Sequence, residues 1–311
     1  MIDMLINLVL AGLFLNTSQT NQLTLAHIQE PNLAVEQVQD LQTTAPQPNP
    51  ASDSVGVKVT AQSVLVVDNE FNKILYQKNS DQVRSIASLT KLMTALVFLD
   101  HNPGWKETIK MQSSDQRAGG IVYLVSGEEF SVYDVFHTML IASSNEAAVA
   151  LARSTGLTQE EFITAMNNKA KELGMENTVF ADTTGLSQLN QSTAVDVMLM
   201  LQTALDQTEI LNATTMKAFQ VDILNSGRTR KIKSTNLILD REFGVEDQVY
   251  EVLAGKTGYL EVAGYCLATL IGNNQGNEIL TVVLGSQSLE DRFNDTKSIA
   301  YWVFNNYIWQ Q

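Results

Sequence analysis

The chain has 311 residues and a formal net charge of −14, from 20 Lys and Arg against 34 Asp and Glu. An acidic chain without a run of basic residues argues against a nucleic-acid-binding protein, because such proteins need a concentrated basic surface. Cys266 is the only cysteine and the three histidines are scattered, so an internal disulfide is excluded, and we expect neither a metal site nor a cofactor.

Three segments are predicted along the chain. Residues 1–15 are mostly apolar, fall short of the 20 or so residues that span a membrane, and have the length of a signal-peptide core. The basic start of a signal peptide is missing, since the first basic residue is Lys58. Residues 16–56 are polar and contain Pro46-Gln-Pro48-Asn-Pro50, which predicts a linker. Hydrophobic periodicity follows, so we expect residues 57–311 to form one folded domain.

The expected elements place strands at both ends of this domain and helices between them. Runs rich in β-branched residues predict strands at 63–68, 73–77, 219–223, 229–233, 264–272 and 278–285. Apolar residues at helical spacing predict helices at 88–99, 131–153, 158–173, 192–206 and 289–307. This order predicts an α+β fold whose terminal strands share one sheet, backed by the last helix.

The first short motif is Ser88-Leu89-Thr90-Lys91. At positions i and i+3 of a helix, the serine and lysine side chains lie on one face within reach of each other. Lysine can take a proton from serine only when it is neutral, so burial or a second cation must lower its pKa. The alternative is that Ser88 caps the helix and that Lys91 is a solvated surface residue.

The second motif is Ser143-Ser144-Asn145, which interrupts two apolar helical runs. A polar break at this point favours side chains that point into a cleft. The alternative is a polar corner between two helices, with Ser143 as the cap of the second.

The third motif is Lys256-Thr257-Gly258, followed by Tyr259 and then by a predicted strand. A cation and a hydroxyl beside a glycine suit an anionic group that approaches the backbone closely. The alternative is an ordinary turn that leads into the strand.

In this order over one domain, S-x-x-K, S-x-N and K-T-G are the signature of penicillin-binding proteins and serine β-lactamases. The chain most resembles the D-alanyl-D-alanine carboxypeptidases, the low-molecular-weight penicillin-binding proteins, over about residues 57–309. Runs similar to that family lie at 85–95, 144–152, 168–175, 183–186 and 256–266. The resemblance implies the transpeptidase fold of β-lactamases and penicillin-binding proteins, in which an antiparallel sheet is joined to a helical subdomain.

The resemblance also implies a role for each residue of the first two motifs. Ser88 would be the acylated nucleophile and Lys91 its general base. Ser143 would relay a proton, and Asn145 would hold an amide of the substrate peptide. We expect Lys256 to lie near Lys91 and to keep it neutral by charge repulsion.

The third motif would bind the substrate. Lys256 and Thr257 would receive the terminal carboxylate of the substrate. The backbone N–H groups of Ser88 and of Tyr259, the residue after Gly258, would form the oxyanion hole, in which one donor is typically worth about 2.7–4 kcal/mol of the barrier.

The implied activity is that of a serine D,D-carboxypeptidase that removes the terminal D-Ala from peptidoglycan stem peptides and is inhibited by β-lactams. A D,D-endopeptidase differs only in accepting a cross-link, and the motifs leave that alternative open. A serine β-lactamase would need a glutamate that activates water, and no E-x-x-L-N segment follows Asn145. A non-catalytic β-lactam or muropeptide sensor is the last alternative, and the intact motif set argues against it.

Two motif positions depart from the usual family pattern. Ile86 stands where many relatives have proline, and Ser144 replaces the usual glycine, which is expected to narrow the cleft slightly. Outside the motifs, Arg228 and Arg230 flank a predicted hairpin turn and are either ligands of a substrate carboxylate or solvated charges.

A cell-wall substrate implies a location outside the cytoplasm. We therefore expect export to the cell envelope, into the periplasm or onto the outer face of the cytoplasmic membrane. Many relatives carry a second domain and an anchoring helix after the last helix of this domain. A membrane tether in this chain would instead use residues 1–15.

Overall fold

The computed structural model of the protein describes residues 48–51, 53–54, 56–239, 242–245 and 248–309. The apolar segment predicted at 1–15 and most of the linker predicted at 16–56 lie outside the described residues, so both stay predictions. None of the helices in the described ranges combines the length and the apolar character that crossing a membrane requires.

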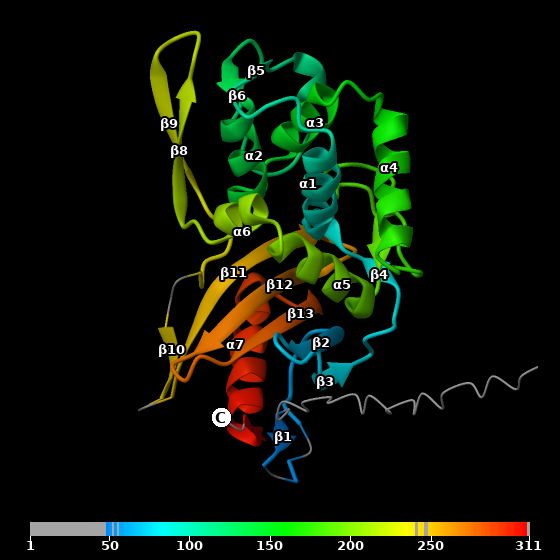
Figure 1. Cartoon of the computed structure of the whole chain (residues 1–311), viewed down its shortest axis with the longest axis vertical. Coiled ribbons are helices and arrows are strands. Elements are labelled where there is room, and N and C mark those ends of the chain that lie inside the picture. The colour runs from blue at the N-terminus through cyan, green and yellow to red at the C-terminus, as the bar shows by residue number, and fades with distance from the viewer. Residues whose placement is uncertain (1–47, 52, 55, 240–241, 246–247, 310–311) are drawn as a thin grey trace, which may run out of the picture. The chain divides into compact units, whose positions relative to one another are not determined.

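A six-stranded antiparallel sheet combines strands from the two ends of the domain (Figure 1). In spatial order its strands are β10 (Glu242–Val245), β11 (Gln248–Leu260), β12 (Gly264–Asn273), β13 (Glu278–Ser286), β2 (Ser63–Asp68) and β3 (Ile74–Lys78). Because β13 pairs with β2, the expectation that the terminal strands share one sheet is confirmed.

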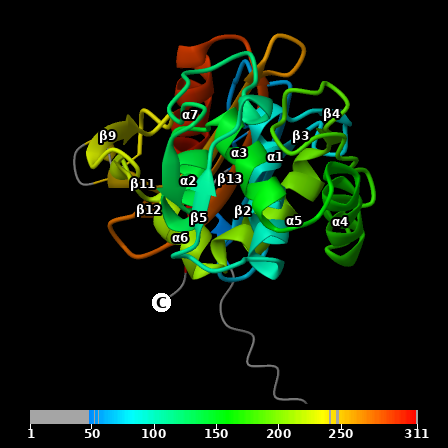
Figure 2. The same cartoon turned by 90° about the horizontal axis from the view of Figure 1, so that it is seen from above.

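Both faces of this sheet are covered, as the alternation of side chains along β2 indicates. Val64 and Val66 belong to the apolar core that α7 (Leu289–Asn306) shares with the sheet. Leu65 and Val67 point to the opposite face and pack in the core formed with the other helices. The last helix therefore backs the sheet as predicted, and the remaining helices form a layer on the other face (Figure 2).

The helical layer is organised around α1, which is buried along all but its last two residues. Its elements are η1 (Ala87–Leu89), α1 (Thr90–Asp100), η2 (Ser113–Asp115), α2 (Val132–Ile141), α3 (Asn145–Ser154), α4 (Gln159–Glu172), α5 (Ala194–Leu205) and α6 (Thr208–Thr214). Serine and threonine side chains cap the N-termini of five helices, which satisfies backbone N–H groups that lack a partner within the helix; these caps are Ser131, Ser144, Thr158, Thr193 and Ser288.

The structure refines the sequence prediction at two places. The helical stretch predicted at 131–153 is two helices, as the polar break at the second motif indicated; Ser143 has a left-handed φ of 57°, and Ser144, not Ser143, caps the second helix. The long strand β11 was not predicted, and the third motif lies inside it instead of before a strand. Both differences concern motif residues, so they decide how the site is built.

Four short antiparallel pairs complete the fold. They are β1 (Asn49–Pro50) with β14 (Tyr307–Ile308), β4 (Arg84–Ser85) with β7 (Gln191–Ser192), β5 (Thr108–Lys110) with β6 (Glu129–Ser131), and β8 (Ala218–Ile223) with β9 (Arg228–Lys233). The first pair joins the described end of the predicted linker to the end of α7. The pairs β4–β7 and β8–β9 lead into segments that line the site.

Candidate active site

Ser88 is the middle residue of η1, directly before the central helix. The preceding residue, Ala87, has a φ of 47°, a left-handed conformation that costs energy for an alanine and is common at functional sites. No side-chain capping bond is present at the start of η1 or α1, which excludes the alternative that Ser88 is a helix cap. Its Oγ instead accepts a hydrogen bond of 2.9 Å from Lys91 Nζ.

Lys91 is fully buried, and its side-chain nitrogen has three hydrogen-bond partners. Besides Ser88 Oγ, its Nζ donates to Asn145 Oδ1 at 2.8 Å and to the Thr184 carbonyl at 2.5 Å. The last two partners can only accept, whereas the serine hydroxyl can also donate. A neutral amine, with two N–H groups and one lone pair, is therefore fully satisfied here.

Burial lowers the pKa of Lys91 to about 7, and the negative charges of Asp182 and Glu146 partly oppose this shift. The expectation that Lys256 keeps Lys91 neutral is corrected, because burial is the main cause. Burial, followed by the positive charges of Lys91 and Arg292, lowers the pKa of Lys256 well below its usual range.

The second motif occupies the turn between α2 and α3. Ser143 Oγ accepts a hydrogen bond of 2.7 Å from Lys256 Nζ, which links this motif to the third. Asn145 holds Lys91 through its oxygen, and its Nδ2 donates to the Gly119 carbonyl at 3.1 Å. Ser144 is 2% exposed and its hydroxyl caps α3, so it does not narrow the cleft as expected.

The third motif lies on β11, where it pairs with β12 from Lys256 opposite Ala268 to Tyr259 opposite Tyr265. Lys256 is buried beneath the strand, and its Nζ also donates to the Thr257 carbonyl at 2.9 Å. The Thr257 hydroxyl lies 2.6 Å from the Thr235 hydroxyl, which brings a second polar side chain to the same wall.

Gly258 allows this strand to touch the turn that carries Ser88. A Cβ at this position would lie 3.0 Å from the Ile86 carbonyl oxygen and 3.3 Å from the Ser88 nitrogen. The absence of a side chain therefore brings the backbone of β11 next to the backbone of Ser88, as two oxyanion donors on these segments require.

The segment 182–190 forms the opposite wall, and the sequence analysis assigned it no role. A Cβ on Gly185 would lie 2.1 Å from the Ala87 carbonyl oxygen, so only glycine fits there. Burial raises the pKa of Asp182, but hydrogen bonds from the Gly185, Ser187 and Thr184 amides outweigh it, so the net pKa is lowered. The ionised carboxylate thus holds the turn that carries the Thr184 carbonyl against Lys91.

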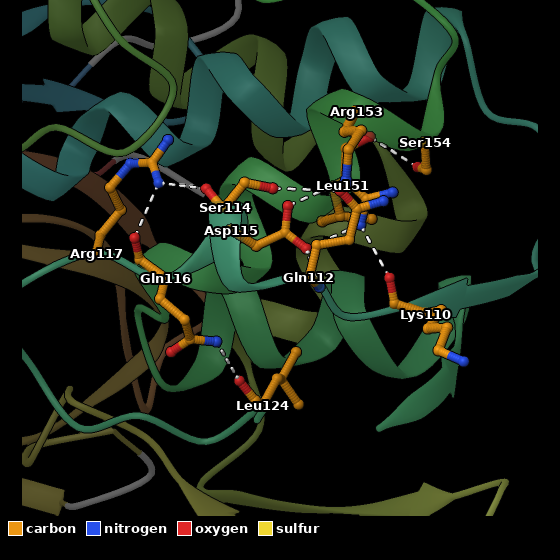
Figure 3. A network of polar contacts seen from close by, with 10 residues as sticks. All are labelled: Lys110, Gln112, Ser114, Asp115, Gln116, Arg117, Leu124, Leu151, Arg153 and Ser154. Atoms are coloured by element: carbon orange, nitrogen blue, oxygen red, sulfur yellow. Dashed lines mark hydrogen bonds and ion pairs between the residues drawn. The ribbon is translucent and has the colours of Figure 1, made fainter. Parts of the chain in front are cut away.

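A loop after η2 forms the rim above Asn145. Figure 3 shows how its base is anchored: Arg153 on α3 binds both carboxylate oxygens of Asp115 and the Lys110 carbonyl. Gln116 Nε2 donates to the Leu124 carbonyl at 3.0 Å and closes the loop. These contacts fix the two ends of the segment that brings Gly119 to the motif asparagine.

The loop is also held from below by a buried carboxylate. Glu146, next to Asn145, accepts hydrogen bonds from the Tyr123 and Leu124 amides at 2.7 and 3.2 Å. The same end of α3 therefore positions both the rim loop, through Glu146, and Lys91, through Asn145. The sequence analysis missed this glutamate, although it directly follows the second motif.

Together these walls enclose a cleft of about 680 Å³. Of the eight predicted site residues, six line it, namely Ser88, Ser143, Asn145, Thr257, Gly258 and Tyr259, while Lys91 and Lys256 lie beneath its floor. Arg292, which the sequence analysis also missed, reaches the cleft from α7 and donates to the Gly258 carbonyl at 3.1 Å. Burial lowers the pKa values of the two lysines beneath the floor, so the positive charge at this end of the cleft comes from Arg292 and suits an anionic ligand.

Glu172 and Glu176, which follow the second motif in the sequence, are not among the residues that line this cleft. Glu172 forms an ion pair with Lys169 at the end of α4, and Glu176 lies in the turn that follows. Among the described residues, the one glutamate in the lining is Glu261, at the end of β11. In the part of the chain that the structure describes, the cleft lining therefore offers no glutamate at the position of a water-activating base beside Ser88.

A pH dependence follows from the neutral lysine. If neutral Lys91 takes the proton, acylation of the protein by a β-lactam should rise about tenfold per pH unit below 7 and level off above it. Stopped-flow measurement between pH 5 and 9 tests this, with circular dichroism as the control that the fold persists. A rate that stays constant over this range would exclude Lys91 as the base.

A family model described as D-alanyl-D-alanine carboxypeptidase matches residues 43–288. The chain belongs to this family. It is 34% identical to a D-alanyl-D-alanine endopeptidase of Haemophilus influenzae over 76% of the chain and 80% of that relative. It is 31% identical to a D-alanyl-D-alanine carboxypeptidase of Bacillus subtilis over 79% of the chain and 63% of that relative.

Solved structures of the family have the same fold. The DD-transpeptidase of Streptomyces K15 superposes with a TM-score of 0.72 at 25% identity, covering 81% of the chain and all of that protein. Penicillin-binding protein D2 of Listeria monocytogenes, in its ampicillin-bound form, gives 0.69 at 29% identity, with 81% and 100% coverage. The predicted fold class is confirmed, and the family makes the chain a serine D,D-peptidase, a hydrolase.

Proposed function

We propose that this D,D-peptidase removes the terminal D-Ala from peptidoglycan stem peptides through an acyl-enzyme on Ser88. The contact that supports this best is the 2.9 Å hydrogen bond between Lys91 Nζ and Ser88 Oγ, in a site where burial lowers the lysine pKa to about 7. A lysine that is neutral at this distance is the base that a serine nucleophile needs.

The reaction has two steps in this proposal. Ser88 Oγ attacks the carbonyl carbon next to the terminal D-Ala and gives its proton to Lys91. The C–N bond then breaks, and the leaving amine takes the proton from Lys91. Ser143, whose hydroxyl accepts a hydrogen bond of 2.7 Å from Lys256 Nζ in the same cleft, is the proposed relay of this proton. Water then attacks the ester, releasing the shortened peptide and returning a proton to Ser88.

The carboxylate of the leaving residue binds at the third motif. The hydroxyls of Thr257 and Thr235 line the cleft 2.6 Å from each other, and Arg292 adds a buried positive charge beside them. The Ser88 and Tyr259 amides stabilise the oxyanion, since Gly258 brings the two segments together. A β-lactam fits the same arrangement and acylates Ser88.

A D,D-endopeptidase is the second candidate, and the names of two relatives favour it. The relatives from Haemophilus influenzae and Escherichia coli, 34% and 33% identical, are both named D-alanyl-D-alanine endopeptidase. In this alternative the chemistry at Ser88 is unchanged, and the leaving amine belongs to a second stem peptide.

The two candidates are compared on matched substrates. The purified protein would be given a monomeric pentapeptide muropeptide and a cross-linked dimer at equal concentration, and the products separated by chromatography. We expect release of D-Ala from the monomer to be the faster reaction. Faster cleavage of the dimer would make the protein an endopeptidase, and no turnover of either would contradict the proposal.

The proposed substrate also gives the proposed location. Peptidoglycan lies outside the cytoplasmic membrane, so the protein would act in the cell envelope after export. Residues 1–15 would serve as a signal segment or as a membrane tether. A fusion to a reporter that is active only outside the cytoplasm, with and without these residues, tests both roles.

A further inference from the structure

The hairpin formed by β8 and β9 has a charge opposite to that of the whole chain. Residues 217–233 contain five of the 20 Lys and Arg residues and only one acidic residue, Asp222, in a chain of net charge −14. Four of the five cations lie on β9, in the run Arg228-Thr-Arg-Lys-Ile-Lys233. Such a reversal of sign on one exposed element favours an anionic partner.

One face of the hairpin is fixed to the domain. Val221 and Ile232 are fully buried against the helical layer, and Phe219 stacks on His137 of α2 with ring centroids 4.9 Å apart. Arg230 belongs to this side as well, because it forms a bidentate ion pair with Glu128 at 2.7 Å. Arg230 is therefore neither a solvated charge nor free for a substrate.

The other face of the hairpin presents two lysines to solvent. Lys231 and Lys233 alternate with Ile232, so they point away from the domain, and both are exposed. Their partners across the strand pair are Gln220 and Ala218, which carry no charge. Neither lysine forms an ion pair with another described residue.

This face adjoins the cleft. The chain leaves β9 at Lys233 and reaches Thr235 two residues later, where the threonine hydroxyl contacts Thr257 and lines the cleft. Figure 1 shows the hairpin extending from this region along β6 and α2. A polymer whose peptide enters the cleft would therefore pass close to these lysines.

We propose that the outer face of β9, through Lys231 and Lys233, binds the free carboxylates of insoluble peptidoglycan next to the stem peptide in the cleft. This inference rests on the proposed function and extends it from a peptide to a polymer. An acidic protein repels an acidic polymer, and salt screens that repulsion beyond about 8–10 Å. A short-range basic face beside the cleft offsets the repulsion where the substrate must enter.

The test compares Lys231→Glu/Lys233→Glu with the control Lys58→Glu/Lys171→Glu, which makes the same charge change at two exposed lysines elsewhere. Binding to sedimented peptidoglycan would be measured at low and high salt. Turnover of a soluble acylated peptide ending in D-Ala-D-Ala would be measured in parallel. We expect the hairpin variant to bind the polymer about tenfold more weakly at low salt and with less salt dependence, while the control resembles wild type.

Turnover of the soluble peptide distinguishes a failure of this inference from a failure of the proposed function. We expect this turnover in the hairpin variant to stay within about twofold of wild type, which would also show that the variant is folded. Three results would each overturn the inference. The hairpin variant could bind the polymer as well as wild type does, the control variant could lose as much binding as the hairpin variant, or the hairpin variant could lose turnover of the soluble peptide along with binding. Absence of soluble turnover in wild type would contradict the proposed function instead.

The chemistry of the polymer identifies the ligand. Amidating its carboxylates should lower wild-type binding to the level of the hairpin variant. If binding instead survives amidation and disappears after hydrofluoric acid removes phosphodiester polymers, the ligand is a phosphate and the proposal is wrong.

Discussion

Ser88→Ala is expected to give a folded protein that forms no covalent adduct with a fluorescent penicillin and releases D-Ala at a rate lower by about 10⁴-fold or more. Alanine removes the only atom that can be acylated at this position, and the hydroxyl lies in a cleft, not in the core. The fluorescence of the protein band after denaturing electrophoresis measures the adduct, and thermal unfolding measures the fold.

A serine in a comparable helical setting provides the control. Ser154→Ala also removes a half-buried hydroxyl, one that bonds the Leu151 carbonyl at 2.7 Å at the end of α3. This variant should label and turn over like wild type. Labelling of Ser88→Ala at the wild-type rate would contradict the assignment of the nucleophile, whereas a loss in both variants would show that the assay reports folding.

Gly185→Ala is expected to lower the acylation rate by about 100-fold, although residue 185 takes no part in the chemistry. Its new Cβ would lie 2.1 Å from the Ala87 carbonyl oxygen, so the nucleophile turn or the 182–186 segment must shift. A displacement of about 1 Å at the reacting atoms typically costs that factor. The same shift would weaken the bond between the Thr184 carbonyl and Lys91.

Gly156→Ala is the matched control, because the backbone cost is the same and the clash is absent. Gly156 has a φ of 84° against 85° for Gly185, and an added Cβ meets no atom within 4 Å. Both variants should lose about 1–2 kcal/mol from the left-handed backbone. Only Gly185→Ala should lose acylation, measured with the fluorescent penicillin. Equal acylation by the two variants would show that contact with Ala87 does not position Ser88.

The secondary structure could be read from the sequence where apolar residues follow a clear pattern. The strand predicted at 63–68 and the last helix follow clear apolar patterns, and the structure has both. The strand β11 was not predicted, because Ala254-Gly-Lys-Thr-Gly258 contains two glycines, an alanine and a lysine, which are depleted in strands, and only one β-branched residue, Thr257. Pairing with β12 forms it, and such pairing is a tertiary property.

The sequence by itself determined the family and predicted the reacting groups. Ser88 and Lys91 are three residues apart because a helix turn must bring them together, and the three motifs occur in a fixed order. Their meeting in one cleft, through Lys91 with Asn145 and Lys256 with Ser143, depends on segments more than 50 residues apart and is visible only in the fold.

Only the tertiary structure decided how these groups can react. The pKa of Lys91 is lowered to about 7 because neighbouring segments exclude water from it, and Asp182 and Glu146, which oppose that shift, come from two other parts of the chain. Burial depends on what packs around a side chain, so no local pattern reports it. Tertiary packing likewise distinguishes the basic residues of β9. Arg230 forms an ion pair with Glu128, whereas the alternation of side chains along the strand leaves Lys231 and Lys233 exposed beside the cleft.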